Sequence, residues 1–355
     1  MAIRVRAWKA EVRTPQRFDF VQDLLAYHLD LQLLDIRPTL RLGYYLGYVF
    51  SFLLAFPRLL LKRFDYLFLE NPYLVVFAPI AKLKRKRVVA EYVDYYPANL
   101  DRLRRQRFLR YQVAKVLCRV AHHFVDVIVV ESETAVRTLE RWGVPRSKVQ
   151  VIPVGVDVQA MVYDPAGRQR VRQTSDFGPT TTVVGYLGKM VDYYHIDEVL
   201  RAVREAFGTG GELACLLVGD GPDRPRLQSL AEELGVRAVF PGSVPHKDVP
   251  AYYSAIDVFV FPLNALAIKL GELMAVGTPL VVPRGMAEDW VTDGVDGLVA
   301  RSNRGPDLAQ ALERFSHLTP EERQSLVTNE QRFAQQNLAL HSVVRKYLQT
   351  IQGLV

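Results

Sequence analysis

Residues 258–282 read VFVFPLNALAIKLGELMAVGTPLVV, and this stretch decides the class of fold. The run 258–262 is apolar without alternation, as expected of a parallel strand buried on both faces. A helical segment follows, and Gly277 and Pro279 end it before a second apolar run begins. A strand, a helix and a strand with short connections form a β-α-β unit, so the sequence predicts an α/β fold with a parallel sheet.

The same alternation extends along most of the chain. Further predicted strands are 66–70, 87–93, 125–130, 149–153, 182–187, 214–218 and 238–241, with a last one at 279–282. Predicted helices include 101–122, 132–142, 196–207 and 223–234. Such a series predicts two doubly wound α/β domains that face each other across a cleft.

Charge is distributed unevenly over these two halves. The whole chain of 355 residues has a net charge of +7. Residues 1–150 hold 26 Lys and Arg against 14 Asp and Glu, a net +12, and residues 151–355 hold 19 against 24, a net −5. Opposite signs indicate two domains with different partners. The basic half favours a polyanion, which is a membrane surface, a phosphorylated substrate or a nucleic acid.

Composition excludes several classes of protein. With 49% hydrophobic and 23% charged residues the chain is globular and not disordered. Cys118 and Cys215 make neither a metal-binding spacing nor a disulfide framework, so we expect buried, inert thiols. The most apolar stretch, 42–57, is shorter than the ~20 residues of a spanning helix and is expected to be an interfacial or core helix. No apolar signal-peptide region is found at the first residues.

Two glycine-containing turns follow predicted strands in the acidic half. In VVGYLGKM (183–190) a glycine lets backbone approach a ligand, and the next lysine can meet a phosphate. LLVGDGP (216–222) forms a tight turn at the strand end where α/β proteins bind ligands. Ordinary turn chemistry and a solvent-exposed lysine are the alternative interpretation. The candidate binding residues here are Gly188, Lys189, Gly219, Asp220 and Gly221.

The helix within 258–282 carries Lys269 and Glu272 on one face, since they are three residues apart. A surface ion pair is the simple interpretation. The alternative is a ligand site in which Glu272 accepts hydrogen bonds from ribose hydroxyls and Lys269 faces a diphosphate.

GELMAVGTPLVV resembles the ExMAxGxPVV signature of family 4 retaining glycosyltransferases, which have the GT-B fold. The segments VGYLGKM, LLVGDGPDRPRL and EDWVTDGVDGLVA are similar to their donor-binding domain in order and spacing. The resemblance implies an acceptor-binding domain at 1–165, a nucleotide-sugar domain at 166–330 and a C-terminal helix, 331–355, that returns to the first domain. It also implies a UDP- or GDP-linked sugar as donor, with no cofactor or metal required.

The resemblance assigns donor contacts position by position. Glu272 matches the second Glu of the family's paired-glutamate motif, which binds the ribose, and Lys189 matches a phosphate-binding Arg. The backbone amides of Leu266, Ala267 and Ile268 are expected to hold the diphosphate. Front-side attack is implied, with the departing phosphate helping to deprotonate the acceptor hydroxyl, so the protein positions the donor and stabilises charge.

This sequence departs from the family pattern at three positions. Asn264 replaces the first Glu and brings no charge. His195 stands where a second phosphate-binding Lys is usual, and Lys269 is expected to supply that charge. Val93 occupies the place of a frequent His, so Asp94 or Glu91 is the candidate polar group. A loop cap is the alternative for Asp94, and a structural role is the alternative for Glu91 and for His195. The predicted catalytic residues are Asp94, Lys189 and Glu272.

Basic clusters at 82–87 (KLKRKR) and 101–110 (DRLRRQRFLR) lie on either side of this acceptor segment in the sequence. Basic residues beside aromatic and aliphatic ones suit an anionic membrane interface, although a solvated charged face is the alternative. No nucleic-acid-binding motif is found. We expect the acceptor or membrane contacts to come from Lys84, Arg85, Glu91, Arg104 and Arg105.

The sequence thus predicts a retaining glycosyltransferase that acts on a lipid or lipid-linked acceptor. It is expected in the cytoplasm, peripheral on the inner face of the cell membrane. Two alternatives stay open: a non-catalytic nucleotide-sugar-binding or scaffold protein of the same fold, and a nucleotide-sugar epimerase.

Overall fold

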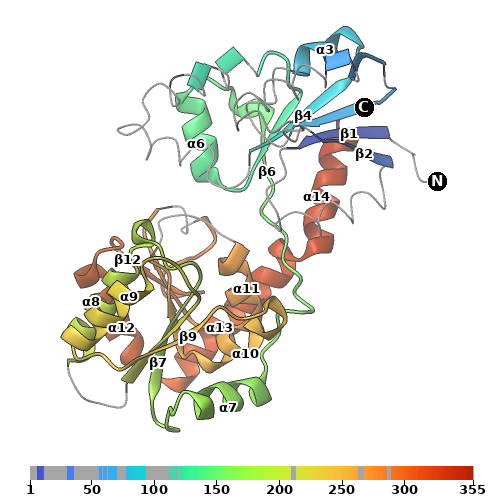
Figure 1. The fold of residues 1–355 in the computed structure, drawn as a ribbon. Coiled ribbons are helices and arrows are strands. Elements are labelled where there is room, and N and C mark those ends of the chain that lie inside the picture. Colours follow the sequence, from blue (N-terminus) through green and yellow to red (C-terminus); the bar gives the residue numbers. More distant parts are fainter. Residues whose placement is uncertain are drawn as a thin grey trace. The chain divides into compact units, whose positions relative to one another are not determined.

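The computed structural model divides the chain into two compact units, Met1–Pro153 with Leu340–Val355, and Val154–Ala339. Each unit is described by itself (Figure 1). The structure describes residues 6–11, 30–35, 56–57, 59–61, 63–69, 77–92, 112, 115–116, 119–120, 122–208, 213–262, 268–285 and 289–354, the first two ranges by their backbone alone.

The first unit is built on a six-stranded parallel sheet in the order β2-β1-β3-β4-β5-β6. Its strands are β1 (Arg6–Glu11), β2 (Asp30–Asp35), β3 (Tyr66–Leu69), β4 (Arg87–Tyr92), β5 (Val127–Val130) and β6 (Val149–Val151). Strands β3 and β5 are buried at every position, which explains their continuous apolar sequences. Helices whose bounds lie within the described residues of this unit are α3 (Ala78–Leu83), α6 (Glu133–Arg141), the short η2 (Arg146–Lys148) and α14 (Leu340–Gln352).

The second unit has a six-stranded parallel sheet of its own, in the order β12-β11-β10-β7-β8-β9. Its strands are β7 (Thr182–Leu187), β8 (Leu213–Val218), β9 (Ala238–Gly242), β10 (Val258–Val260), β11 (Leu280–Pro283) and β12 (Leu298–Ala300). Its helices are α7 (Pro165–Thr174), η3 (Asp192–Tyr194), α8 (Ile196–Phe207), α9 (Arg224–Glu233), η4 (His246–Asp248), α10 (Val249–Ala255), α11 (Ile268–Val276), α12 (Gly305–Ser316), α13 (Pro320–Phe333) and the π-helical η6 (Ala334–Leu338). Cys215 lies buried in β8, and burial raises the pKa of its thiol to about 12, which fits an inert thiol.

The last helix, α14, packs on the sheet of the first unit. The Tyr66 hydroxyl donates a hydrogen bond to the Ile351 carbonyl (3.3 Å), and the Tyr347 hydroxyl donates to the Glu91 carboxylate. A shared apolar cluster joins the helix to the strands: Tyr66, Phe68, Val89, Val127, Val129, Ile152, Val343, Val344, Tyr347 and Ile351. The C-terminal residues are therefore part of the core of the first unit.

The chain passes between the units after Pro153 and after Ala339, whereas the boundaries predicted from the sequence are at 165 and 330. A parallel β-bridge between Val156 and Ala339 pairs the two flanking segments with each other, and both segments belong to the second unit. Neither segment contains a strand or a composition change that the sequence pattern could reveal.

An aspartate fixes the amino end of one strand pair in each sheet. In the first unit Asp126 precedes β5, and its carboxylate accepts hydrogen bonds from the Val88 amide at the start of β4 (2.7 Å) and from Lys82 of α3 (2.5 Å). Burial acts to raise the pKa of Asp126, but these hydrogen bonds and the charges of Lys82 and Arg87 outweigh it, so the pKa is lowered.

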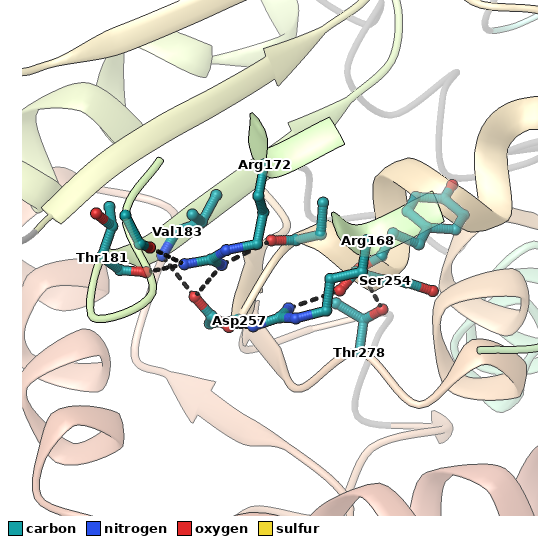
Figure 2. Close-up of polar contacts among 10 residues, drawn as sticks. Arg168, Arg172, Thr181, Val183, Ser254, Asp257 and Thr278 are labelled. Carbon is teal, nitrogen blue, oxygen red and sulfur yellow. Dashed lines mark hydrogen bonds and ion pairs between the residues drawn. The ribbon is translucent and has the colours of Figure 1, made fainter. Parts of the chain in front are cut away.

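Asp257 does the same before β10 in the second unit (Figure 2). Its carboxylate accepts from the Val183 amide at the start of β7 (2.8 Å) and pairs with Arg168 (2.7 Å) and Arg172 (3.0 Å) of α7. Buried Arg172 also donates to the carbonyls of Ala255, Gly178 and Thr181. This network ties α7 to the amino edge of the second sheet.

Replacing Asp257 tests that network. Asp257→Ala removes the side-chain acceptor of the Val183 amide and the anionic partner of Arg168 and Arg172, and we expect a loss of about 3 kcal/mol of unfolding free energy. Asp257→Asn keeps one acceptor for the amide and should lose less. The control Arg314→Gln removes an exposed ion pair with Asp293 and should cost below about 1 kcal/mol. Thermal unfolding measures all three, and equal melting temperatures for Asp257→Ala and Arg314→Gln would contradict the assignment.

Glu330 of α13 gives a pH-dependent prediction. Burial, and then the nearby charge of Asp296, raise the pKa of the fully buried Glu330 carboxyl well above its usual range. The folded protein therefore keeps a proton that the unfolded chain releases, so stability falls as the pH rises above about 4.3, by at most about 1.4 kcal/mol per pH unit. Glu330→Gln should melt at a higher temperature than the native protein at pH 8, and the difference should shrink towards pH 5. A difference that stays constant with pH would refute this.

Candidate functional site

The candidate donor residues follow three neighbouring strands of the second sheet. Strands β10, β7 and β8 are adjacent and parallel, so their carboxyl ends lie at one edge. Gly188 and Lys189 follow β7, the Gly219–Gly221 turn follows β8, and α11 follows β10 with Lys269 and Glu272 in its first two turns. The structure thus brings together at one sheet edge residues that lie up to 84 positions apart in the sequence.

The turns after β7 and β8 are in direct backbone contact. The Gly188 amide donates to the Val218 carbonyl (2.8 Å), and the Met190 amide donates to the Asp220 carbonyl (2.9 Å). A Cβ at Gly219 would lie 1.8 Å from the Gly188 carbonyl oxygen, and Gly219 has a φ of +129°. Only glycine therefore permits this close approach.

Lys269 lies against the Gly188 turn. A Cβ built on Gly188 would be 2.2 Å from the Lys269 Nζ, so the lysine ammonium occupies the space that a side chain would fill. The same Nζ lies 5.9 Å from the centre of the Tyr186 ring, and the Tyr186 hydroxyl donates to the Lys189 carbonyl (2.9 Å). A positive charge is thereby held at the carboxyl end of β7, next to backbone that can approach an anion.

Glu272 is buried and its carboxylate has two partners. The Tyr253 hydroxyl donates to Oε2 (3.3 Å), and the His246 Nε2 lies 3.1 Å from Oε1. Burial, and then the Glu272 charge, raise the pKa of Tyr253 well above its ordinary value, so the phenol keeps its proton. The Tyr253 ring packs edge-on against Phe259 of β10, with ring centres 6.1 Å apart. The carboxylate is therefore anchored on the aromatic core of the unit.

His195 lies just before α8 in a left-handed conformation, with φ 54° and ψ 37°. A non-glycine residue rarely adopts this conformation, which costs about 1–2 kcal/mol. Nearby, Arg226 of α9 forms a bidentate pair with Asp223 (2.6 and 2.8 Å) and lies 3.8 Å from Asp197. The loops around His195 are thus fixed by charge pairs, while Lys189 and Asp220 are exposed to solvent.

Several predicted positions lie outside the described residues. These are Val93, Asp94, Arg104, Arg105, Cys118, Asn264, Leu266 and Ala267. Ile268 is described as the first residue of α11. Within the described ranges no group of three or more His, Cys, Asp or Glu residues is arranged to hold a metal ion.

The predicted acceptor residues of the first unit are separated by β4. Lys84 and Arg85 form the turn before this strand, while Glu91 lies near its carboxyl end. The Lys84 ammonium donates to the carbonyls of Leu59 (3.1 Å) and Leu60 (2.9 Å). Glu91 accepts from Tyr347, so its contact with α14 holds the C-terminal helix. The basic cluster and Glu91 therefore belong to opposite edges of the sheet.

Sequence reasoning missed the two partners of Glu272. His246 and Tyr253 lie in the segment after β9, 26 and 19 residues before the glutamate. The segment VPHKDVPAYY contained both residue types, but nothing in its spacing points to α11. Only the fold brings the two elements together.

Two family models match the chain. A model described as Glycosyltransferase Family 4 matches residues 13–160, and one described as Glycosyl transferases group 1 matches residues 181–317. Together these ranges cover most of the chain and both units.

Curated relatives match over part of their length. A GDP-mannose-dependent alpha-(1-6)-phosphatidylinositol monomannoside mannosyltransferase of Mycolicibacterium smegmatis is 32% identical over 200 residues, which is 53% of this chain and 52% of the relative. A 2-deoxystreptamine glucosyltransferase of Streptomyces kanamyceticus is 26% identical over 229 residues, 59% of this chain and 58% of the relative. The matched part of the chain thus spans little more than half the length of these relatives.

Solved structures share the fold over nearly the whole chain. Anabaena Alr3699/HepE in complex with UDP has a TM-score of 0.77 at 17% identity, covering 98% of this chain and 100% of that one. Sucrose-phosphate synthase from Thermosynechococcus elongatus has a TM-score of 0.78 at 18% identity and covers 99% of both chains. The predicted fold is confirmed: the chain has the GT-B fold and belongs to glycosyltransferase family 4.

Proposed function

We propose that this protein is a retaining glycosyltransferase that moves a sugar from a nucleotide-sugar to a lipid or lipid-linked acceptor. Donor binding is proposed because buried Glu272, the Lys269 ammonium and the glycine turns lie together at one edge of the second sheet. Family membership supports the reaction class, and the relatives that act on phosphatidylinositol mannosides support a lipid-linked acceptor.

The arrangement suits the chemistry of sugar transfer. In the proposed reaction the bond between the anomeric carbon and the diphosphate breaks, a bond from that carbon to the acceptor oxygen forms, and the acceptor proton passes to the departing phosphate. Lys269, Lys189 and the backbone amides near Gly188 would stabilise the charge that develops on the diphosphate. Glu272 would accept hydrogen bonds from the ribose, and Gly219–Gly221 would let backbone approach the nucleotide closely. Asp94, which follows β4 in the sequence and lies outside the described residues, remains our candidate to contact the acceptor.

The proposal includes two bases for the donor nucleotide, uracil and guanine. The mannosyltransferase relatives are named as GDP-mannose-dependent, whereas Alr3699/HepE is bound to UDP. The GT-B fold is common to both kinds of protein, so it does not select one of the two bases. We therefore propose a UDP- or GDP-linked hexose with no required cofactor.

An anionic membrane surface is the proposed partner of the first unit. Leu60, Leu61 and Leu83, which we call the leucine patch, are large apolar side chains exposed by 53%, 84% and 81%. The hydrogen bond from Lys84 to the Leu60 carbonyl joins the two segments that carry them. Basic residues that the structure describes close to these leucines in the sequence are Arg63, Lys82, Lys84, Arg85, Lys86 and Arg87.

Apolar side chains beside basic ones suit the boundary between lipid headgroups and acyl chains. Within the described residues, no helix is both long enough and apolar enough to cross a bilayer. We accordingly propose peripheral binding at the cytoplasmic face of the cell membrane, where a lipid-linked acceptor would be reached.

Glu272→Gln tests the donor site. The variant keeps the shape of the side chain but loses its charge-assisted hydrogen bonds, each worth about 1.5–3 kcal/mol. We expect its affinity for UDP or GDP, whichever the native protein binds, to fall roughly 10- to 100-fold in isothermal titration calorimetry. Glu205→Gln, an exposed carboxylate on α8, is the matched control and should bind normally. Unchanged nucleotide binding by Glu272→Gln would contradict the assignment of the donor site.

Leu61→Asp combined with Leu83→Asp tests the membrane surface. Co-sedimentation with phosphatidylglycerol-containing vesicles should fall about tenfold or more, since two apolar anchors are lost and two negative charges are added. Val295→Asp, at an exposed apolar residue of the second unit, is the control and should sediment normally. Binding of the native protein should fade at high salt. Equal sedimentation of the native protein with neutral vesicles would count against an anionic partner.

A further inference from the structure

Two side chains from a single segment hold the Glu272 carboxylate. The segment follows β9 and consists of η4 and α10, with His246 as its first residue and Tyr253 near its end. His246 reaches Oε1 at 3.1 Å and Tyr253 reaches Oε2 at 3.3 Å, so each carboxylate oxygen has one partner.

The two partners differ in their surroundings. Tyr253 is fully buried, packs against Phe259, and its own carbonyl accepts from the Thr278 hydroxyl (3.1 Å). The His246 side chain is 72% exposed although Glu272 is buried. Tyr253 is therefore a fixed part of the core, whereas His246 stands at the boundary between the buried carboxylate and solvent.

Among the residues that the structure describes, these two contacts leave lone-pair positions of the Glu272 carboxylate unused. An ionised carboxylate has about four lone-pair positions, and the two side chains use one on each oxygen. The remaining positions can accept from two neighbouring hydroxyls, such as the 2′- and 3′-hydroxyls of a ribose. A carboxylate fixed in place before the ligand arrives loses less conformational entropy on binding than a freely rotating one.

We propose that His246 is a positioning residue that fixes the Glu272 carboxylate for a vicinal diol and thereby makes the donor site selective for ribonucleotides. The proposal rests on the proposed function, because it takes Glu272 as the ribose-binding group. His246 acts through Glu272, so its effect is confined to ligands that carry the ribose hydroxyls.

A comparison of ligands tests the proposal directly. UDP, GDP and their 2′,3′-dideoxy counterparts are titrated into the native protein and into His246→Ala, His246→Gln and Glu272→Gln. We expect the native protein to prefer the ribonucleotide. His246→Ala should lower that preference about five- to tenfold and leave the affinity for the dideoxynucleotide unchanged. His246→Gln should restore most of it, because the glutamine amide can donate to the same oxygen.

The controls distinguish a failure of the role proposed for His246 from a failure of the ribose site proposed at Glu272. His317→Ala removes a histidine at the end of α12 and should leave every affinity unchanged. Equal weakening of ribo- and dideoxynucleotide binding by His246→Ala would show a merely structural role and overturn the proposal, as would a His246→Gln variant that behaves like His246→Ala. If Glu272→Gln keeps the full preference for the ribonucleotide, the proposed ribose site itself fails. A reduced preference in Glu272→Gln without one in His246→Ala would reject the role of His246 alone.

Discussion

The amino edge of each sheet depends on an aspartate that precedes an interior strand, β5 in the first sheet and β10 in the second. Asp126 and Asp257 each donate their own amide to a carbonyl of the neighbouring strand (2.9 Å in both) and accept that same residue's amide with their carboxylate. Each carboxylate also binds cations from the helix that precedes the neighbouring strand. The side chain thus continues the strand pairing at a point where the ladder ends, and it fixes strand and helix together.

Asp257 fixes the amino edge of the second sheet, and the candidate ligand-binding residues lie at its opposite, carboxyl edge. At the carboxyl ends of β7 and β8 the turns are held by backbone contacts that require glycine, and the Lys269 ammonium and the Tyr186 hydroxyl occupy the space next to Gly188. Tyr186, Phe259 and Tyr253 form the apolar layer beneath, and Glu272 is attached to it through the Tyr253 hydroxyl. In the proposed function, these local groups of the acidic second half hold the anionic donor despite the overall charge of that half.

Sequence patterns identified the apolar strands of both sheets, because parallel strands buried on both faces are continuous runs such as VIVV and LACLLV. They missed β1 and β2, whose sequences RAWKAE and DLQLLD mix polar and apolar residues, and β12, which has only three residues. The pattern Asp-Val-x-Val occurs at 126–129 and again at 257–260, and it marks equivalent strand starts in the two sheets.

Glu272 is predicted from its motif, but the role proposed for His246 depends on a contact between elements that no local pattern encodes. For Glu91 the sequence position predicts an acceptor contact, whereas the structure shows a hydrogen bond from the Tyr347 hydroxyl of α14.

We propose that this protein transfers a sugar to a lipid, and turnover tests that proposal most directly. Purified protein is incubated with UDP- or GDP-linked hexoses and a membrane lipid extract, and both the released nucleoside diphosphate and the mass of the lipids are measured. The account predicts release that depends on the lipid, matched by a lipid product heavier by one hexose. Nucleotide-sugar binding without lipid-dependent release would contradict it and would support a non-catalytic nucleotide-sugar-binding protein of the same fold.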